Sequence, residues 1–335
     1  MSAWTVGRRR DLGKLARAGS STVRGLALLP AIVALVVIGA FVNPAFMRVS
    51  NLSNVAQQSA ALGAVVVAES LIMLIGNMDL SVQSTYGLAP MIGAWLIVPI
   101  AGQGLGTELP PLAGVAIALL VGLLVGTING LCVIRARFNG FIFTLAMLTL
   151  LAGIQVGIVS GRTVYRLPDA FIYLGSGALL GIPVSVLVSA AIFLASGLFL
   201  HYHRLGRAMY AIGGNLEAAR AAGIRVDAIR IGVFMVAGVL AALAGVMTAG
   251  RVVAVTANQG SGLIFTVFAA AVVGGISLNG GRGRMIGALS GVVLLALVNN
   301  ILILSEIQTF WIDASNGVMI LIALTMARFI GTETA

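Results

Sequence analysis

Long apolar stretches separated by short polar turns run along most of this chain of 335 residues. A helix that crosses a hydrocarbon core of about 30 Å needs about 20 mainly apolar residues. The pattern therefore predicts an all-α integral membrane protein, a polytopic bundle of about ten transmembrane helices. The predicted spans cover residues 25–43, 55–76, 82–101, 112–134, 141–160, 182–200, 230–250, 262–279, 285–305 and 314–330.

A polar segment of 30 residues, 201–230, interrupts this pattern between the sixth and seventh spans. We predict a short helix at its centre, over residues 215–222. Asn215 is a favourable N-cap, and Glu217 suits the positive end of a helix. Gly223 then ends the helix in a left-handed conformation that other residues resist. A small capped helix between two spans indicates a docking element.

Composition supports the membrane assignment. Hydrophobic residues make up 59% of the chain and charged residues 9%, against roughly 25% charged residues in soluble domains. The net charge of +10 is spread over the loops, so it does not indicate a nucleic-acid partner. The single cysteine, Cys132, excludes an intrachain disulfide.

The basic residues also predict an orientation. With the N-terminus inside, residues 1–24 form a basic cytoplasmic arm that attracts anionic membrane lipid, and residues 25–335 form the transmembrane domain. Segment 201–230 and the C-terminus are then cytoplasmic, as the positive-inside rule favours. Four basic residues fall outside, namely Arg48, Arg162, Arg166 and Arg251.

Polar residues inside the predicted spans are candidates for a translocation path. Such residues are costly in a membrane and often face a cavity or a partner helix. The candidates are Glu69 in the second span, Asp79 and Ser81 at the break before the third, and Asn299 and Asn300 in the ninth. Two structural alternatives stay open. Glu69 is equally a buried carboxyl bonded to a neighbouring helix, and for Asp79 the stronger interpretation is that Asp79 or Ser81 caps the third span.

Glycines at four-residue spacing occur in the fourth span and at the start of the ninth. Small residues at this spacing let membrane helices approach closely. The glycines are Gly122, Gly126 and Gly130, then Gly283, Gly287 and Gly291.

The sequence contains no recognisable catalytic site. His201 and His203 lack neighbouring acids or cysteines, so we expect no metal site. The glycine-rich segment 274–283 lacks the lysine and preceding strand of a phosphate-binding loop. We therefore expect no enzyme activity and no cofactor, and an energy source outside this chain.

Four stretches resemble the permease subunits of bacterial ABC importers for monosaccharides of the ribose, xylose and galactose type. Branched-chain amino acid permeases are more distant relatives. The stretches are residues 76–82 (GNMDLSV), residues 129–131 (NGL) with residues 141–145 (FIFTL), residues 206–224 (GRAMYAIGGNLEAARAAGI) and residues 274–283 (GGISLNGGRG).

The chain departs from the family pattern at four positions. Asn77 replaces the family's second glycine, Gln83 replaces the glycine usual after Ser-Val, and Asn139 and Gly140 replace prolines. In family members these places form the route or its gate, so the resemblance leaves the solute open.

The resemblance implies the partners and the coupling element. It implies a homodimer, or a heterodimer with a sister permease, bound to an ABC ATPase that carries two nucleotide-binding domains. It also implies a periplasmic sugar-binding protein and a place in the bacterial inner membrane. The helix in 215–223 becomes the coupling helix that touches the ATPase. Its candidate contact residues are Asn215, Glu217, Ala218, Ala219, Arg220 and Gly223.

Other transport functions remain open from the sequence. The alternative to a sugar is another small solute, namely a polyol, a nucleoside or a branched-chain amino acid. A transporter from a different class would use Glu69 and Asp79 for ion coupling and would need no ATP.

Overall fold

The computed structural model describes residues 28–107 and 109–308 and individual positions between 310 and 325. The predicted basic arm, residues 1–24, and the end of the tenth predicted span lie outside the described residues. The described elements are α2 (Leu29–Val42), α3 (Val49–Leu74), α4 (Val82–Ile97), η1 (Ile100–Gly102), α5 (Pro111–Gly130), η2 (Leu131–Arg135), α6 (Gly140–Ile158), α7 (Asp169–Ser176), β1 (Ala178–Leu179), β2 (Ile182–Pro183), α8 (Val184–Tyr202), α9 (Arg204–Gly214), α10 (Leu216–Ala221), α11 (Val226–Val252), α12 (Leu263–Val273) and α13 (Met285–Leu304).

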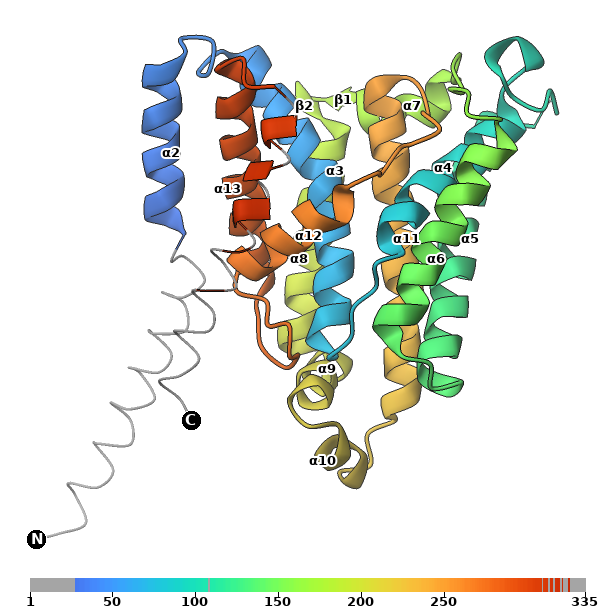
Figure 1. The fold of residues 1–335 in the computed structure, drawn as a ribbon, viewed down its shortest axis with the longest axis vertical. Coiled ribbons are helices and arrows are strands. Elements are labelled where there is room, and N and C mark those ends of the chain that lie inside the picture. Colours follow the sequence, from blue (N-terminus) through green and yellow to red (C-terminus); the bar gives the residue numbers. More distant parts are fainter. Residues whose placement is uncertain are drawn as a thin grey trace, which may run out of the picture.

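Six helices of the described part are long and apolar enough to cross a membrane: α3, α5 with its continuation η2, α6, α8, α11 and α13. Each coincides with a predicted span. They lie roughly side by side in Figure 1, with α9 and α10 at one end of the bundle and α7, β1 and β2 at the other. The chain is therefore an all-α, multi-pass membrane protein, apart from the two-residue strands β1 and β2.

Three further predicted spans contain shorter helices. Within the predicted span 25–43 the structure describes α2, a helix of 14 residues. The span 82–101 contains α4, whose 16 residues cover about 24 Å and end just before Pro99. The span 262–279 contains α12, whose 11 residues cover about 16 Å. This helix ends at Val273, Gly274 is its C-cap, and the next residue, Gly275, has a φ of +83°.

Helix α11 packs against α5, α3, α4 and α7. Its contact with α5 depends on the predicted glycine spacing. A Cβ atom at Gly122 would lie 2.3 Å from the Gly238 carbonyl oxygen, and one at Gly126 would lie 2.3 Å from the Phe234 carbonyl oxygen. The predicted close approach of helices at these glycines is confirmed.

Two helices lie outside the predicted pattern. Helix α7 fills the turn between the fifth and sixth spans, and α9 begins directly after α8. The helical period of α9 is present in the sequence, because Leu205, Met209 and Ile212 lie at i, i+4 and i+7. The buried positions Gly206, Met209 and Ile212 define one face of α9. The helix therefore packs against the end of the bundle while its other face remains exposed.

Candidate functional site

The predicted short helix in the polar segment is present as α10, over Leu216–Ala221. The Asn215 side-chain oxygen accepts a hydrogen bond from the Ala218 N–H at 2.9 Å. After α10, Gly223 has a φ of +78°, and the Ile224 N–H donates to the Ala219 carbonyl oxygen at 3.1 Å. The predicted N-cap and glycine termination are therefore both confirmed.

The side chains of α10 face in different directions. Glu217, Ala218 and Arg220 are exposed, together with the flanking Asn215. Ala219, in contrast, is 3% exposed and packs into the main hydrophobic core. The outer surface of α10 is thus formed by small and charged side chains, and Ala219 anchors the helix to the bundle.

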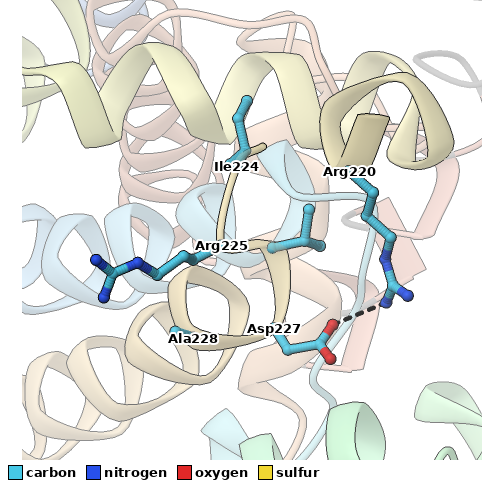
Figure 2. Close-up of a pocket in the computed structure, with 6 residues that line it drawn as sticks. Arg220, Ile224, Arg225, Asp227 and Ala228 are labelled. Atoms are coloured by element: carbon cyan, nitrogen blue, oxygen red, sulfur yellow. Dashed lines mark hydrogen bonds and ion pairs between the residues drawn. The ribbon is translucent and has the colours of Figure 1, made fainter. Parts of the chain in front are cut away.

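Arg220 forms an ion pair within the chain. Its Nη2 lies 2.8 Å from Asp227 Oδ1 at the start of α11. Figure 2 shows this pair beside a shallow depression, with the Arg225 side chain pointing away from the pair. The depression is lined by Arg220, Ile224, Arg225, Val226, Asp227 and Ala228. Both partners are about half exposed, so this link between α10 and the start of α11 contributes little stability.

Three backbone segments meet where α9 approaches α10, and we call this contact the glycine junction: residues 74–76, 213–214 and 280–281. The Gly281 N–H donates to the Leu74 carbonyl oxygen at the end of α3 at 2.9 Å. A Cβ atom at Gly213 would lie 1.9 Å from that oxygen, and one at Gly280 would lie 2.9 Å from the Gly76 Cα. The end of α9, directly before the N-cap of α10, is therefore in backbone contact with α3 and with the α12–α13 link.

Tyr210 on α9 strengthens the same region. Its hydroxyl donates to the Gly283 carbonyl oxygen at 2.9 Å. Burial raises the pKa of Tyr210 above its ordinary value and so further favours the protonated hydroxyl that donates this bond.

Inside the bundle, two acids and two amide or hydroxyl side chains form a buried network. Glu69 is 0% and Asp79 3% exposed, and Glu69 Oε1 accepts from the Asp79 N–H at 3.2 Å. Asp79 Oδ1 accepts from the Ser81 N–H at 2.9 Å and from its hydroxyl at 2.6 Å. Asn129 on α5 donates to Asp79 Oδ2 at 3.0 Å and to Ser81 Oγ at 2.6 Å. These bonds tie the α3–α4 link to α3 and α5.

The hydrogen bonds of this network also show which side chain holds the start of α4 and which oxygens stay unpaired. Asp79 accepts the N–H of Ser81, the residue that precedes α4, whereas the Ser81 side chain makes no capping bond. The Leu80 N–H donates to Thr144 Oγ1 on α6 at 3.2 Å. Among the described residues, Glu69 Oε2 and Asn129 Oδ1 have no hydrogen-bond partner. Such buried unpaired oxygens are rare and are available to another group when the bundle changes shape.

The two candidates in α13 differ. Asn300 forms a reciprocal pair with Asn51 on α3, with N···O distances of 2.9 and 3.0 Å. Asn299 has a buried side-chain oxygen with no partner in the described part of the chain. Asn300 therefore joins two helices, whereas the side-chain oxygen of Asn299 can still accept a hydrogen bond.

Sequence reasoning did not single out several polar residues that the structure brings together. Arg230 donates from Nη2 to Asn77 Oδ1 at 3.0 Å, joining the start of α11 to the α3–α4 link. Gln155 and Gln259 hold a non-helical segment between α11 and α12. Asn77 and Gln83 could have been singled out from the sequence, because both depart from the family pattern. A lone glutamine inside or beside an apolar span carries no comparable signal.

An apolar helical bundle with buried polar side chains and a capped helix exposed at one end is typical of a membrane transport subunit. Comparison with known proteins identifies the class. The chain belongs to the family described as the permease component of the branched-chain amino acid transport system, whose model matches residues 51–324. As a permease component it is not itself an ATPase.

Individual relatives cover most of the chain. The ribose import permease protein RbsC of Haemophilus influenzae is 33% identical over 307 residues, 90% of this chain and 93% of the relative. RbsC of Escherichia coli K12 is 35% identical over 300 residues, 88% of this chain and 91% of the relative. The autoinducer 2 import system permease protein LsrC of Klebsiella pneumoniae is 36% identical over 304 residues, 90% of this chain and 86% of the relative. No solved structure matches the chain.

Proposed function

We propose that this chain is the membrane-spanning permease subunit of an ATP-driven importer for ribose-type sugars, and that α10 couples it to a separate ATPase. The observation that carries the coupling role is the capped, exposed α10, which sits directly against the glycine junction. The ribose import permeases among the relatives, which match about 90% of the chain, support the solute class.

The proposed topology has ten spans in the bacterial inner membrane, with both termini cytoplasmic. The short helices α4 and α12 complete their spans through the extended segments that precede them. The charge distribution of the loops supports this orientation, because most basic residues then lie inside. The α9–α10 end of the bundle in Figure 1 is the cytoplasmic end in this topology.

The proposed assembly contains an ABC ATPase with two nucleotide-binding domains, a periplasmic sugar-binding protein, and a second permease, either a second copy of this chain or a sister chain. Glu217, Ala218 and Arg220 provide the outer surface of the coupling helix, while Asn215, Ala219 and Gly223 hold its shape. Closure of the ATPase moves α10, and the glycine junction passes the movement to α3 and to the α12–α13 link.

The path candidates divide by their contacts. Asp79, Ser81 and Asn300 use their side chains to join helices. Glu69 and Asn299 each keep a buried oxygen without a partner among the described residues. We therefore retain Glu69 and Asn299 as groups that face the path when it opens.

The substitution Glu217→Arg tests the coupling role. It reverses the only acid on the surface of α10, so we expect loss of the ATPase on co-purification and loss of sugar uptake, with normal membrane insertion. Asp169→Arg, at the α7 end, is the matched control and should retain the ATPase. A Glu217→Arg complex that keeps its ATPase and transports normally would contradict the coupling assignment.

Autoinducer 2 is the second candidate solute, because the autoinducer 2 import permease LsrC is as similar to this chain as the ribose permeases are. Thermal shift of the cognate binding protein with D-ribose, autoinducer 2, polyols, nucleosides and branched-chain amino acids separates these possibilities. Stabilisation by D-ribose alone supports the first proposal, and stabilisation by autoinducer 2 alone replaces it.

A further inference from the structure

Residues 253–262, between α11 and α12, enter the bundle without forming a helix. Val253 begins the segment in the left-handed region, with a φ of +58°. Val255 is 0% exposed and exchanges two backbone hydrogen bonds of 2.9 Å with Val164. Non-helical backbone inside a membrane protein is tolerated where protein buries it or where it lines a water-filled cavity. In this segment Val255 is buried, whereas Val253, Asn258, Ser261 and Gly262 are exposed.

Gln259 fastens the segment to two helices. Its amide nitrogen donates to the Tyr86 carbonyl oxygen at 3.3 Å and to the Gly245 carbonyl oxygen at 3.1 Å. The Tyr86 carbonyl lacks the usual helical donor because the residue four positions on is Pro90, which has no N–H. A side chain from the segment thus satisfies a carbonyl that the helix itself leaves open.

Gln155 on α6 fastens the same segment from the other side. It is 2% exposed, and its amide nitrogen donates to the carbonyl oxygens of Thr256 and Gln259 at 3.3 and 3.2 Å. Gly87 on α4 leaves the room for this contact, because a Cβ atom there would lie 2.1 Å from the Gln259 carbonyl oxygen.

Gln83 joins the beginnings of the two short helices. Its side-chain oxygen accepts the Ile264 N–H at 3.1 Å, so the first turn of α4 meets the first turn of α12. We call Gln83, Gln155 and Gln259 the amide cluster. Transporters bind solute where interrupted helices meet inside the membrane, and two such helices meet here.

The chemistry of the cluster indicates the kind of solute. Its three side chains are neutral and offer both donors and acceptors, which suits the hydroxyl groups of an uncharged polyol or sugar. Each of the bonds described above joins an amide to main-chain N–H or C=O groups. Solute hydroxyls can pair with these amides, and the main-chain groups that the amides release, such as the Tyr86 carbonyl, then need solute or water as new partners.

We propose that residues 253–262 form a gate across the solute route and that the amide cluster contacts the solute when this gate opens. In the closed state the amides hold the segment, and in the open state they bind hydroxyl groups of a neutral polyhydroxylated solute. The proposal rests on the permease function proposed above. It names three residues that determine which solute the permease accepts: Gln83, Gln155 and Gln259.

Cysteine labelling tests the gate without knowledge of the solute. In the complete transporter carrying Cys132→Ala, Val255→Cys is compared with Val246→Cys, since both valines are 0% exposed and Val246 lies within α11. We expect a membrane-impermeant maleimide to label position 255 at least roughly tenfold faster during ATP turnover than without ATP. Position 246 should stay unreactive. Equal, slow labelling of both positions in every state would overturn the gate.

Uptake tests the contact with solute. In proteoliposomes with the ATPase and binding protein, Gln155→Leu should lower D-ribose uptake per ATP hydrolysed roughly fivefold, the effect of losing about one hydrogen bond. Gln58→Leu, at an exposed position of α3, is the matched control and should transport normally.

Monodeoxy analogues of D-ribose separate contact from structural support. If Gln155 binds one hydroxyl of D-ribose, the wild-type complex should take up the analogue that lacks this hydroxyl more slowly than D-ribose itself. In Gln155→Leu the difference in uptake between this analogue and D-ribose should be smaller. The variant and the analogue then remove the same hydrogen bond, so their effects are not additive. A uniform decrease for all analogues would overturn the solute contact. Absence of D-ribose uptake by the wild-type complex would instead overturn the proposed solute, while the labelling result still decides the gate.

Discussion

The glycine junction and the amide cluster both hold non-helical backbone against the bundle, but they do so with different groups. At the glycine junction, main chains touch directly and no side chain intervenes. At the amide cluster, side chains reach backbone groups across the gap. Backbone contacts of this kind have no alternative arrangement nearby, whereas a side-chain amide can exchange one partner for another. The difference suggests a stiff connection near α10 and an exchangeable one within the bundle.

The largest expected effect comes from Gly213→Ala. The added methyl group would lie 1.9 Å from the Leu74 carbonyl oxygen, so the segments must separate. We expect the free energy of unfolding to fall on the order of 3 kcal/mol, measured by denaturant unfolding in detergent, and uptake to be lost. Gly214→Ala is the control, because a methyl group there meets nothing within 4 Å. Similar behaviour of the two variants would show that the junction is not tightly packed.

A smaller effect is expected for Gln259→Leu, which leaves the buried Tyr86 carbonyl without a donor. The cost in unfolding free energy should be about 1–3 kcal/mol. Pro90→Ala restores a backbone donor to that carbonyl, so Gln259→Leu should cost about 1 kcal/mol less in the Pro90→Ala background. The same assay measures all three variants, and strict additivity would refute the role given to Pro90.

The smallest effect is expected for Asp227→Asn, which weakens the ion pair with Arg220. Because both side chains are about half exposed, the change in unfolding free energy should be below about 1 kcal/mol and should shrink further at high salt. Co-purification of the ATPase is the sensitive measurement, since the pair links α10 to the start of α11. Asp169→Asn, at the other end of the bundle, should change neither quantity.

Much of the fold was predictable because each prediction depended on local sequence. Apolar stretches of sufficient length gave the six long spans, and Asn215 and Gly223 gave the limits of α10. The glycine spacing in α5 predicted a close approach of helices. Residues 204–214 were missed as a helix although Leu205, Met209 and Ile212 have helical spacing, because the surrounding segment is polar and was interpreted as a connection.

The candidate path was less predictable, because polar side chains reveal their role only through their partners. Asn299 and Asn300 are adjacent in sequence, yet one pairs with Asn51 and the other keeps an unpaired oxygen. Gln155 and Gln259 were not predicted as a pair, since they are 104 positions apart. Nothing in either local sequence indicates the other.

By itself, the sequence determined that this protein crosses a membrane repeatedly, that it belongs with permeases, and that a capped helix stands between two spans. Those properties follow from hydrophobic length, motif order and helix-end chemistry, which act over a few residues. Only the tertiary structure decided that α10 adjoins a glycine junction, that Gln155 and Gln259 join residues 253–262 to the bundle, and that Gln83 binds the start of α12. Such contacts join distant segments, and their energy exists only once packing has removed water and brought the groups within hydrogen-bond distance.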